Sequence, residues 1–403
     1  MADPSSVVGR RAAVVAVCTA AMGAGTAPAF LYGYLGPEIR ADLDLSRGGL
    51  GLLIGLFYGL TGLGSLVAAR VAQPWGARRC IVVDQVVVAG CLLASVAFPS
   101  ALVLGLAAGV AGVGYALGNA GTSMAVAATA PAGRAGRDLT VKTAGVPLMA
   151  TVLALAGPAV ARSVGWEGVA LALAVVAAAT AVAGGLLLPA RPAARGRGVA
   201  ATAEPDRPLP PGFALLPLAA FLFIAGSQPL LSWLVLSLTD AGVGTATAGA
   251  VSAAGTGAGV VAMVLVARLS DRVGPPRRAL VAAGLAGLAL LGVLLLWSTA
   301  GSPLVLVVVG AVVGLFGNLA GASTIHAVVV DRAPWAVGRA IALMSTGYFL
   351  GALVAPWAFG LAADLTGGYA LSWGGCAVAL AGSAVCFVLV HRRVAVPGLR
   401  VPG

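Results

Sequence analysis

Three ionisable side chains stand in apolar stretches of this sequence, and each could do a different chemistry. Lys142 is the only lysine, and Asp84 and His326 have mainly apolar neighbours. An ammonium group can bind an anion as a point charge, whereas a carboxyl or imidazole group can carry a proton. Each also has a structural alternative: Lys142 can extend to a polar interface, Asp84 can pair with Lys142 or lie at that interface, and His326 can bond to a neighbour. We treat Lys142 as a candidate anion-binding residue, and Asp84 and His326 as candidate proton carriers.

Uncharged polar residues recur at helical spacing within other apolar stretches. Tyr115, Asn119 and Ser123 are four residues apart, and Asn318 and His326 are eight apart, so each group shares one face of a helix. Such groups either line a path for a polar solute or hold neighbouring helices together by hydrogen bonds. The candidates for a substrate cavity are Tyr34, Tyr115, Asn119, Ser123, Lys142, Gln228, Ser232, Asn318, Ser345 and Tyr348.

The elements that must position these residues are membrane-spanning helices. The chain is 60% hydrophobic and 9% charged, with a mean hydropathy of +1.02, whereas soluble domains have about 25% charged residues. About twelve apolar runs have the roughly 20 residues that cross a bilayer, and alternating patterns of a membrane barrel are absent from the sequence. The sequence therefore predicts an all-α integral membrane protein with twelve transmembrane helices.

The chain has a net charge of +11, and the positions of its basic residues predict the topology. With the N-terminus inside, 21 of the 24 basic residues fall on the cytoplasmic side, and only Arg40, Arg47 and Arg162 fall outside. This bias favours a multi-pass protein of the cytoplasmic (inner) membrane with both termini in the cytoplasm. We expect contact with membrane lipid and no binding of nucleic acid, since no basic face is interleaved with aromatic residues.

Nothing in the sequence indicates an enzyme. The five cysteines lack the paired spacing of a zinc site or a disulfide framework. A phosphate-binding loop and a nucleophile motif are also absent from the sequence. We expect no cofactor and no metal.

A polar segment divides the chain into two related halves. We expect an N-terminal six-helix bundle over residues 1–189, a cytoplasmic linker over 190–212, and a C-terminal six-helix bundle with a short cytoplasmic tail over 213–403. Matching residues repeat about 198 positions apart: Gly76 and Gly274, Arg134 and Arg332, and Pro158 and Pro356. An internal repeat of six helices is typical of transporters whose site lies near the membrane midplane.

A short motif recurs between helices 2 and 3 and between helices 8 and 9 of this arrangement. The second copy keeps Asp271, Arg272 and Gly274, and the first keeps Gly76 and Arg78. The chain thereby resembles the major facilitator superfamily of secondary transporters, whose motif reads Gly-x-x-x-Asp-Arg-x-Gly-Arg-Arg. The resemblance implies two pseudo-symmetric six-helix bundles and a gating role for these five residues. Glycine permits the tight turn that such a loop needs.

These observations predict a monomeric secondary active transporter that moves a small organic solute by alternating access. Because the cavity candidates include a lysine and amides rather than carboxylates, we favour an organic anion, with protons as a candidate coupling ion. One alternative is a proton-coupled exporter of a hydrophobic drug or metabolite. A second is a non-transporting membrane receptor or assembly subunit on the same fold.

Overall fold

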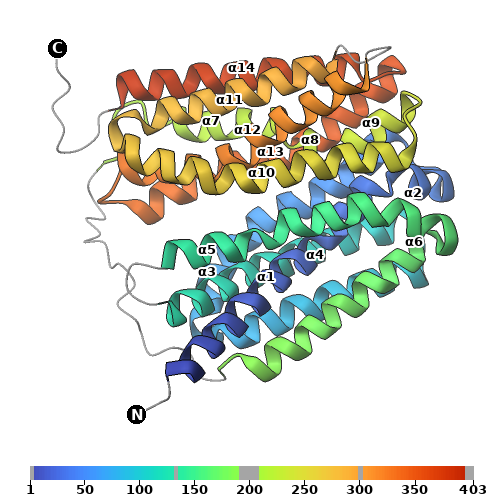
Figure 1. Cartoon of the computed structure of the whole chain (residues 1–403), viewed down its shortest axis with the longest axis horizontal. Helices are drawn as coiled ribbons and strands as arrows, with labels where there is room; N and C mark the ends of the chain where they lie inside the picture. The colour runs from blue at the N-terminus through green and yellow to red at the C-terminus, as the bar shows by residue number, and fades with distance from the viewer. Residues whose placement is uncertain (1–3, 131–134, 190–207, 298–302, 395–403) are drawn as a thin grey trace. The chain divides into compact units, whose positions relative to one another are not determined.

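The computed structural model describes residues 4–130, 135–189, 208–297 and 303–394, and these residues form helices without any strand (Figure 1). The prediction of an all-α chain is confirmed. The fourteen helices of the described residues are α1 Pro4–Tyr34, α2 Gly36–Leu43, α3 Arg47–Ala97, α4 Ala101–Thr129, α5 Ala135–Thr143, α6 Gly145–Leu187, α7 Leu215–Ser227, α8 Pro229–Ser232, α9 Leu234–Asp240, α10 Thr245–Val273, α11 Pro275–Trp297, α12 Leu304–Arg332, α13 Val337–Thr366 and α14 Ala370–Arg393.

A backbone turn at Gly165 decides how many membrane spans the described residues contain. Eleven helical stretches of the described residues are long and apolar enough to cross a membrane. One of them, Asp138–Leu187, has 50 residues, more than twice the roughly 20 that a bilayer requires. Gly165 divides it with φ 71° and ψ 172°, a conformation that is essentially restricted to glycine. This stretch therefore supplies two spans, and the total agrees with the twelve that the sequence predicts.

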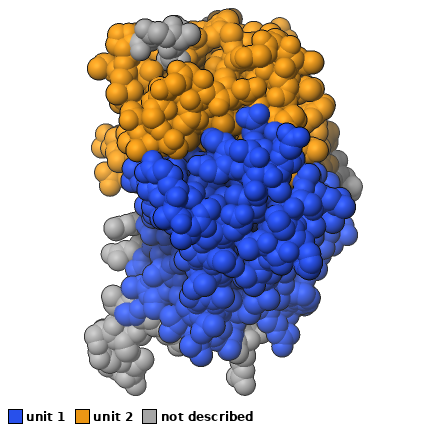
Figure 2. All heavy atoms as spheres, turned by 90° about the vertical axis from the view of Figure 1, so that its right-hand side faces the viewer, with its two compact units in different colours: residues 1–45, 56–196 blue, residues 46–55, 197–403 orange. Residues whose placement is uncertain are grey.

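The described residues form two compact units, which Figure 2 shows in different colours. Unit 1 comprises residues 1–45 and 56–196, and unit 2 comprises residues 46–55 and 197–403. This division resembles the predicted bundles, except that the first residues of α3 belong to unit 2. Most of the predicted linker, residues 190–207, lies outside the described residues, as does Arg134 of the sequence repeat.

Polar contacts join the first residues of α3 to the rest of unit 2. Arg47 Nη2 lies 2.8 Å from Asp240 Oδ2, and Tyr369 donates its hydroxyl to the same oxygen over 2.7 Å. The backbone N–H groups of Arg47 and Gly48 donate to Asp364 over 3.0 and 2.7 Å. Burial and the neighbouring Asp240 raise the pKa of Tyr369, so this hydroxyl keeps the proton that it donates. The start of α3 is thus held by polar groups of unit 2.

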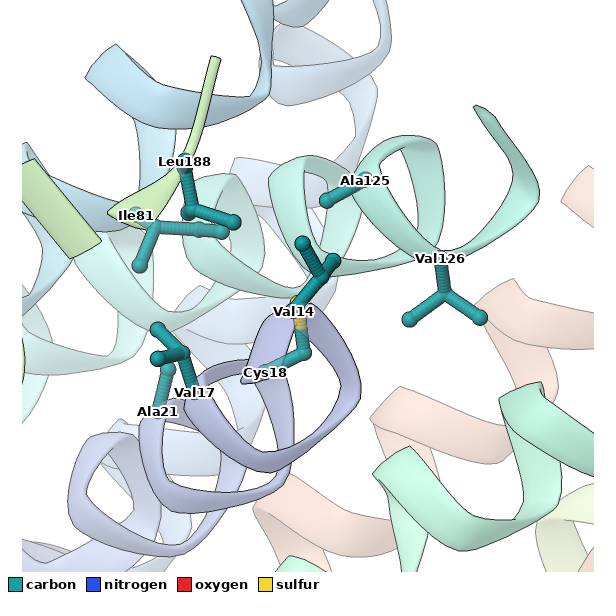
Figure 3. Packing of buried hydrophobic residues seen from close by; sticks show 8 residues of the cluster. All are labelled: Val14, Val17, Cys18, Ala21, Ile81, Ala125, Val126 and Leu188. Atoms are coloured by element: carbon teal, nitrogen blue, oxygen red, sulfur yellow. The ribbon is translucent and has the colours of Figure 1, made fainter. Parts of the chain in front are cut away.

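Small and β-branched residues build the core that positions the site of unit 1 (Figure 3). The residues of this buried cluster are Val14, Val17, Cys18 and Ala21 of α1, Ile81 of α3, Ala125 and Val126 of α4, and Leu188 after α6. Glycines bring helices close elsewhere in the unit: a side chain on Gly145 would overlap the backbone of Thr19. Small residues commonly allow such close packing between membrane helices. This packing positions the polar residues of α3, α4 and α5.

Candidate functional site

Lys142 lies in the last turn of α5 and is buried, with 3% of its surface exposed. Its ammonium nitrogen donates to Asn119 Oδ1 and to Ser123 Oγ, both over 2.8 Å. Asn119 and Ser123 are one turn apart on α4, so their side chains reach the same point. The structure thus brings three of the predicted cavity residues together.

The Lys142 ammonium group forms no ion pair with any described residue. The nearest carboxylate along its own helix, Asp138, is held by Arg11 of α1. Arg11 Nε donates to Asp138 Oδ2 over 2.8 Å, and Nη2 donates to Oδ1 over 2.7 Å. A two-pronged contact of this kind is strong and directional. Sequence reasoning missed this pair, which joins residues 127 positions apart.

Asp84 of α3 is also buried but does not pair with Lys142. Its exposed fraction is 1%, and the side-chain amide of Gln85 donates to Oδ2 over 2.8 Å and to the carbonyl of Ala21 over 3.1 Å. The other carboxyl oxygen has no hydrogen-bond partner among the described residues. The carboxyl group fills the space that Gly118 leaves on α4, where a side chain would overlap it. Gly118 directly precedes Asn119, so neighbouring residues of α4 contact the two ionisable groups.

The two tyrosines predicted in this half pack against other aromatic rings. The ring of Tyr115 lies 5.7 Å from that of Phe57, between centroids. Tyr34 is buried at the end of α1 and stacks on Phe30 with the ring centroids 5.9 Å apart. Both aromatic pairs belong to unit 1.

In unit 2, Asn318 supports a break in the seventh span. Asn318 Nδ2 donates to the carbonyl of Ser227 over 2.7 Å. That carbonyl ends α7, and Leu231 donates its N–H to Gln228 instead. A freed carbonyl in an apolar setting needs another donor, and Asn318 supplies it. Ser232 donates its hydroxyl to the carbonyl of Gln228 over 3.2 Å, so Gln228, Ser232 and Asn318 gather at this break.

His326, Ser345 and Tyr348 lie on α12 and α13 of unit 2. His326 Nδ1 lies 2.9 Å from the carbonyl of Ala322 in its own helix, which places the proton on Nδ1. Its ring centroid is 6.3 Å from that of Tyr348. The side chain of His326 is exposed, and those of Ser345 and Tyr348 are half-buried.

The two motif glycines have nearly the same backbone conformation. Gly76 has φ 78° and ψ 159°, and Gly274 has φ 75° and ψ 175°. Both values fall where a Cβ atom is strongly disfavoured. The sequence repeat is therefore matched by a repeated tight turn, one in each unit.

The charged residues of the motif form fewer hydrogen bonds and ion pairs than Arg278, the basic residue that follows the motif. Arg278 Nη1 lies 2.7 Å from both carboxyl oxygens of Asp331, whereas its Nη2 lies 3.7 Å from Asp271. The side chain of Asp271 is 82% exposed. Arg78 and Arg272 form no hydrogen bond or ion pair with the described residues. Sequence reasoning missed Asp331, because only the fold brings α12 to the start of α11.

The described residues contain no group of three or more His, Cys, Asp or Glu that could hold a metal ion. All five cysteines are free thiols. The polar groups near Lys142 can hold an ammonium charge, accept hydrogen bonds and, at Asp84, carry a proton.

The model of the Major Facilitator Superfamily matches residues 12–334 of this chain. A bacterial homolog of the human lysosomal transporter Spinster is similar in structure over 98% of both chains at 16% identity, with a TM-score of 0.69 to its inward-facing occupied form and 0.71 to its inward-facing unoccupied form. A mutant form of the nucleoside transporter NupG matches over 95% of this chain and 99% of its own, with a TM-score of 0.71 and 14% identity. No curated protein sequence matches. At these identities the structural likeness shows the fold.

Proposed function

This chain belongs to the Major Facilitator Superfamily and is a secondary transporter, and we propose that its solute is a small organic anion bound by Lys142. The observation that carries the proposal is the surroundings of the Lys142 ammonium group, which is buried and bonded only to neutral oxygens. These oxygens solvate the charge without neutralising it. An anion arriving at this point supplies the missing opposite charge.

The energetic argument rests on the cost of a buried charge. A charged group taken out of water without a counter-ion is unfavourable by several kcal/mol in typical cases. Asn119 and Ser123 offset part of that cost. Because Asp138 is already held by Arg11, the strongest remaining compensation is a carboxylate or similar group of the solute. Binding energy then depends on the charge of the solute, which is how the site would select anions over cations.

Lys142 is tested by two substitutions that separate charge from size. Lys142→Arg keeps a cation, and Lys142→Gln removes it. We expect the arginine variant to retain part of the transport and the glutamine variant to lose at least ~10-fold, because a hydrogen bond to a charged group contributes about 1.5–3 kcal/mol. The measurement is counterflow of radiolabelled organic anions in proteoliposomes at equal amounts of folded protein.

Arg162→Gln is the matched control, since Arg162 is an exposed basic residue of the same unit. It should transport like the unchanged chain. Equal transport by all three forms at position 142 would refute the role of the ammonium charge. Counterflow of hydrophobic drugs in place of anions would favour the exporter alternative, and absence of counterflow with any panel compound would favour a receptor or assembly subunit.

We propose that Asp84 carries the coupled proton. Its support is the unpartnered buried oxygen together with the neighbouring contacts of α4, where Gly118 faces Asp84 and Asn119 binds Lys142. Binding of an anion at Lys142 changes the local charge, which alters the cost of ionising the carboxyl group nearby. Protons and solute would thus move together in each cycle of alternating access. His326 remains a second candidate carrier in unit 2.

Asp84→Asn should uncouple transport while preserving the fold. Asparagine retains an oxygen that accepts from Gln85 but cannot release a proton. We expect accumulation of solute driven by a pH gradient to be lost and gradient-free exchange to persist. Asp44→Asn is the control, since Asp44 is an exposed carboxylate of unit 1. Retention of pH-driven accumulation in Asp84→Asn would assign the proton to another group.

A further inference from the structure

A surface pocket of about 540 Å³ lies between α3 and α6 of unit 1, away from the residues around Lys142. Its wall combines two arginines, an aromatic ring and apolar side chains. The lining residues are Trp75, Arg78, Arg79, Val82, Val83 and Gly185. None of these residues is used by the proposed transport site.

The two guanidinium groups of this pocket differ from those of Arg11 and Arg278 in their contacts with the described residues. Arg78 and Arg79 form no hydrogen bond or ion pair with any residue that the structure describes. By contrast, Arg11 and Arg278 each hold a carboxylate of their own unit. Each guanidinium group is planar and offers five N–H donors in a geometry that suits phosphate oxygens.

The charged and apolar side chains of the pocket follow one another along the axis of α3. The turn at Gly76 ends one span and begins the next, so Trp75 and the arginines lie at the membrane edge. Val82 and Val83 follow about one turn further into the apolar span. Trp75 is 42% exposed, and tryptophan is enriched at the membrane–water interface. The wall therefore passes from cationic to apolar toward the membrane interior.

Glycine on α6 keeps the pocket open. Gly185 is half-buried at the end of the helix, and a Cβ atom placed there would lie 4.0 Å from Val82 Cγ2. That distance is an ordinary contact, so the backbone does not require glycine for close packing here. A larger side chain would instead occupy space between the two helices.

We propose that this pocket binds one anionic phospholipid. The phosphate lies between Arg78 and Arg79, and an acyl chain follows Val82 and Val83. A soluble phosphate would use only the charged part of the wall, whereas a phospholipid also contacts the apolar part through its acyl chain. The predicted topology puts the turn at Gly76, inside α3, in the cytoplasmic leaflet, where anionic lipids attract basic residues.

The test measures binding of phosphatidylglycerol to the full chain in detergent by native mass spectrometry. The double variant Arg78→Gln/Arg79→Gln should weaken apparent affinity by about five-fold per arginine, or ~25-fold in all. Arg392→Gln/Arg393→Gln is the matched control, because these two arginines are likewise adjacent and lie exposed at the end of a span. It should change affinity by no more than about two-fold.

Gly185→Leu tests the shape of the pocket with both charges intact. It should also weaken phosphatidylglycerol binding, and thermal unfolding without lipid checks that each variant is folded. Phosphatidylcholine should bind more weakly than phosphatidylglycerol, and glycerol phosphate should fail to displace the lipid. Equal losses in both double variants, no effect of Gly185→Leu, or full displacement by glycerol phosphate would each overturn the proposal of a lipid site.

Discussion

Asn119 and Asn318 lie 199 positions apart, close to the offset of the sequence repeat, and they use opposite ends of their amide groups. Asn119 accepts from Lys142 through its oxygen, whereas Asn318 donates through its nitrogen to the carbonyl of Ser227. One contact holds a charge that can interact with a solute. The other satisfies a backbone group at a helix break. The same residue type at related positions is therefore expected to serve binding in unit 1 and stability in unit 2.

Asn318→Ala should lower stability more than it lowers the activity of each folded molecule. Loss of its amide leaves the Ser227 carbonyl unsatisfied, which costs about 1–3 kcal/mol. Asn119→Ala should instead reduce transport per folded molecule. Thermal unfolding and counterflow, measured on the same preparations, separate these effects. Ser323→Ala, on the exposed side of α12, is the control; a large transport defect in stable, fully folded Asn318→Ala would place that residue in the solute path.

Residue spacing could predict part of this site, because helical periodicity places Asn119 and Ser123 on one face. It could not show that Lys142 reaches them, since that contact depends on how α5 lies against α4. Gln85 was within reach of sequence reasoning, as a second polar residue beside Asp84 in an apolar run. The Arg11–Asp138 and Arg278–Asp331 pairs were not, because each joins helices far apart in the chain.

At the scale of the element, three glycines with positive φ divide or join the spans. Gly76, Gly165 and Gly274 combine φ between 71° and 78° with nearly extended ψ. Hydropathy predicts the number of spans, because each apolar run must cross the membrane. The break between α7 and α8 escapes hydropathy, since Pro229 interrupts the helix without interrupting the apolar run.

Gly274→Ala should destabilise the chain through backbone strain alone. The nearest atom to an added Cβ would be Pro276 Cδ at 3.7 Å, so no clash contributes. Residues held in this region of φ and ψ cost about 1–3 kcal/mol. Gly284→Ala of α11 is the matched control, with negative φ and nothing within 4 Å of the added Cβ.

The control should be neutral or slightly stabilising, since alanine favours a helix over glycine by about 1 kcal/mol. Chemical or thermal unfolding in detergent gives the comparison. Equal stability of the two variants would show that the turn at Gly274 relaxes without cost.

At the scale of the whole molecule, the distribution of arginines predicts the orientation of the chain. A reporter fused after residue 403 should stay in the cytoplasm: a fluorescent protein should be fluorescent there, and alkaline phosphatase should be inactive. The physical reason is the excess of basic residues in the loops assigned to the inside. Active phosphatase at the C-terminus would contradict the predicted topology. A fusion after residue 241, between α9 and α10, should give the opposite result to that at the C-terminus.

The burial of Lys142 gives the folded chain an internal reporter of its own opening. As the only lysine, it is the sole internal primary amine, and 3% of its surface is exposed. A small amine-reactive compound in water can modify that nitrogen only while the surrounding helices admit it. The rate of modification, followed by the mass of one peptide, therefore measures how often the site becomes accessible. A solute that occupies the site should slow the reaction without any need for an engineered label.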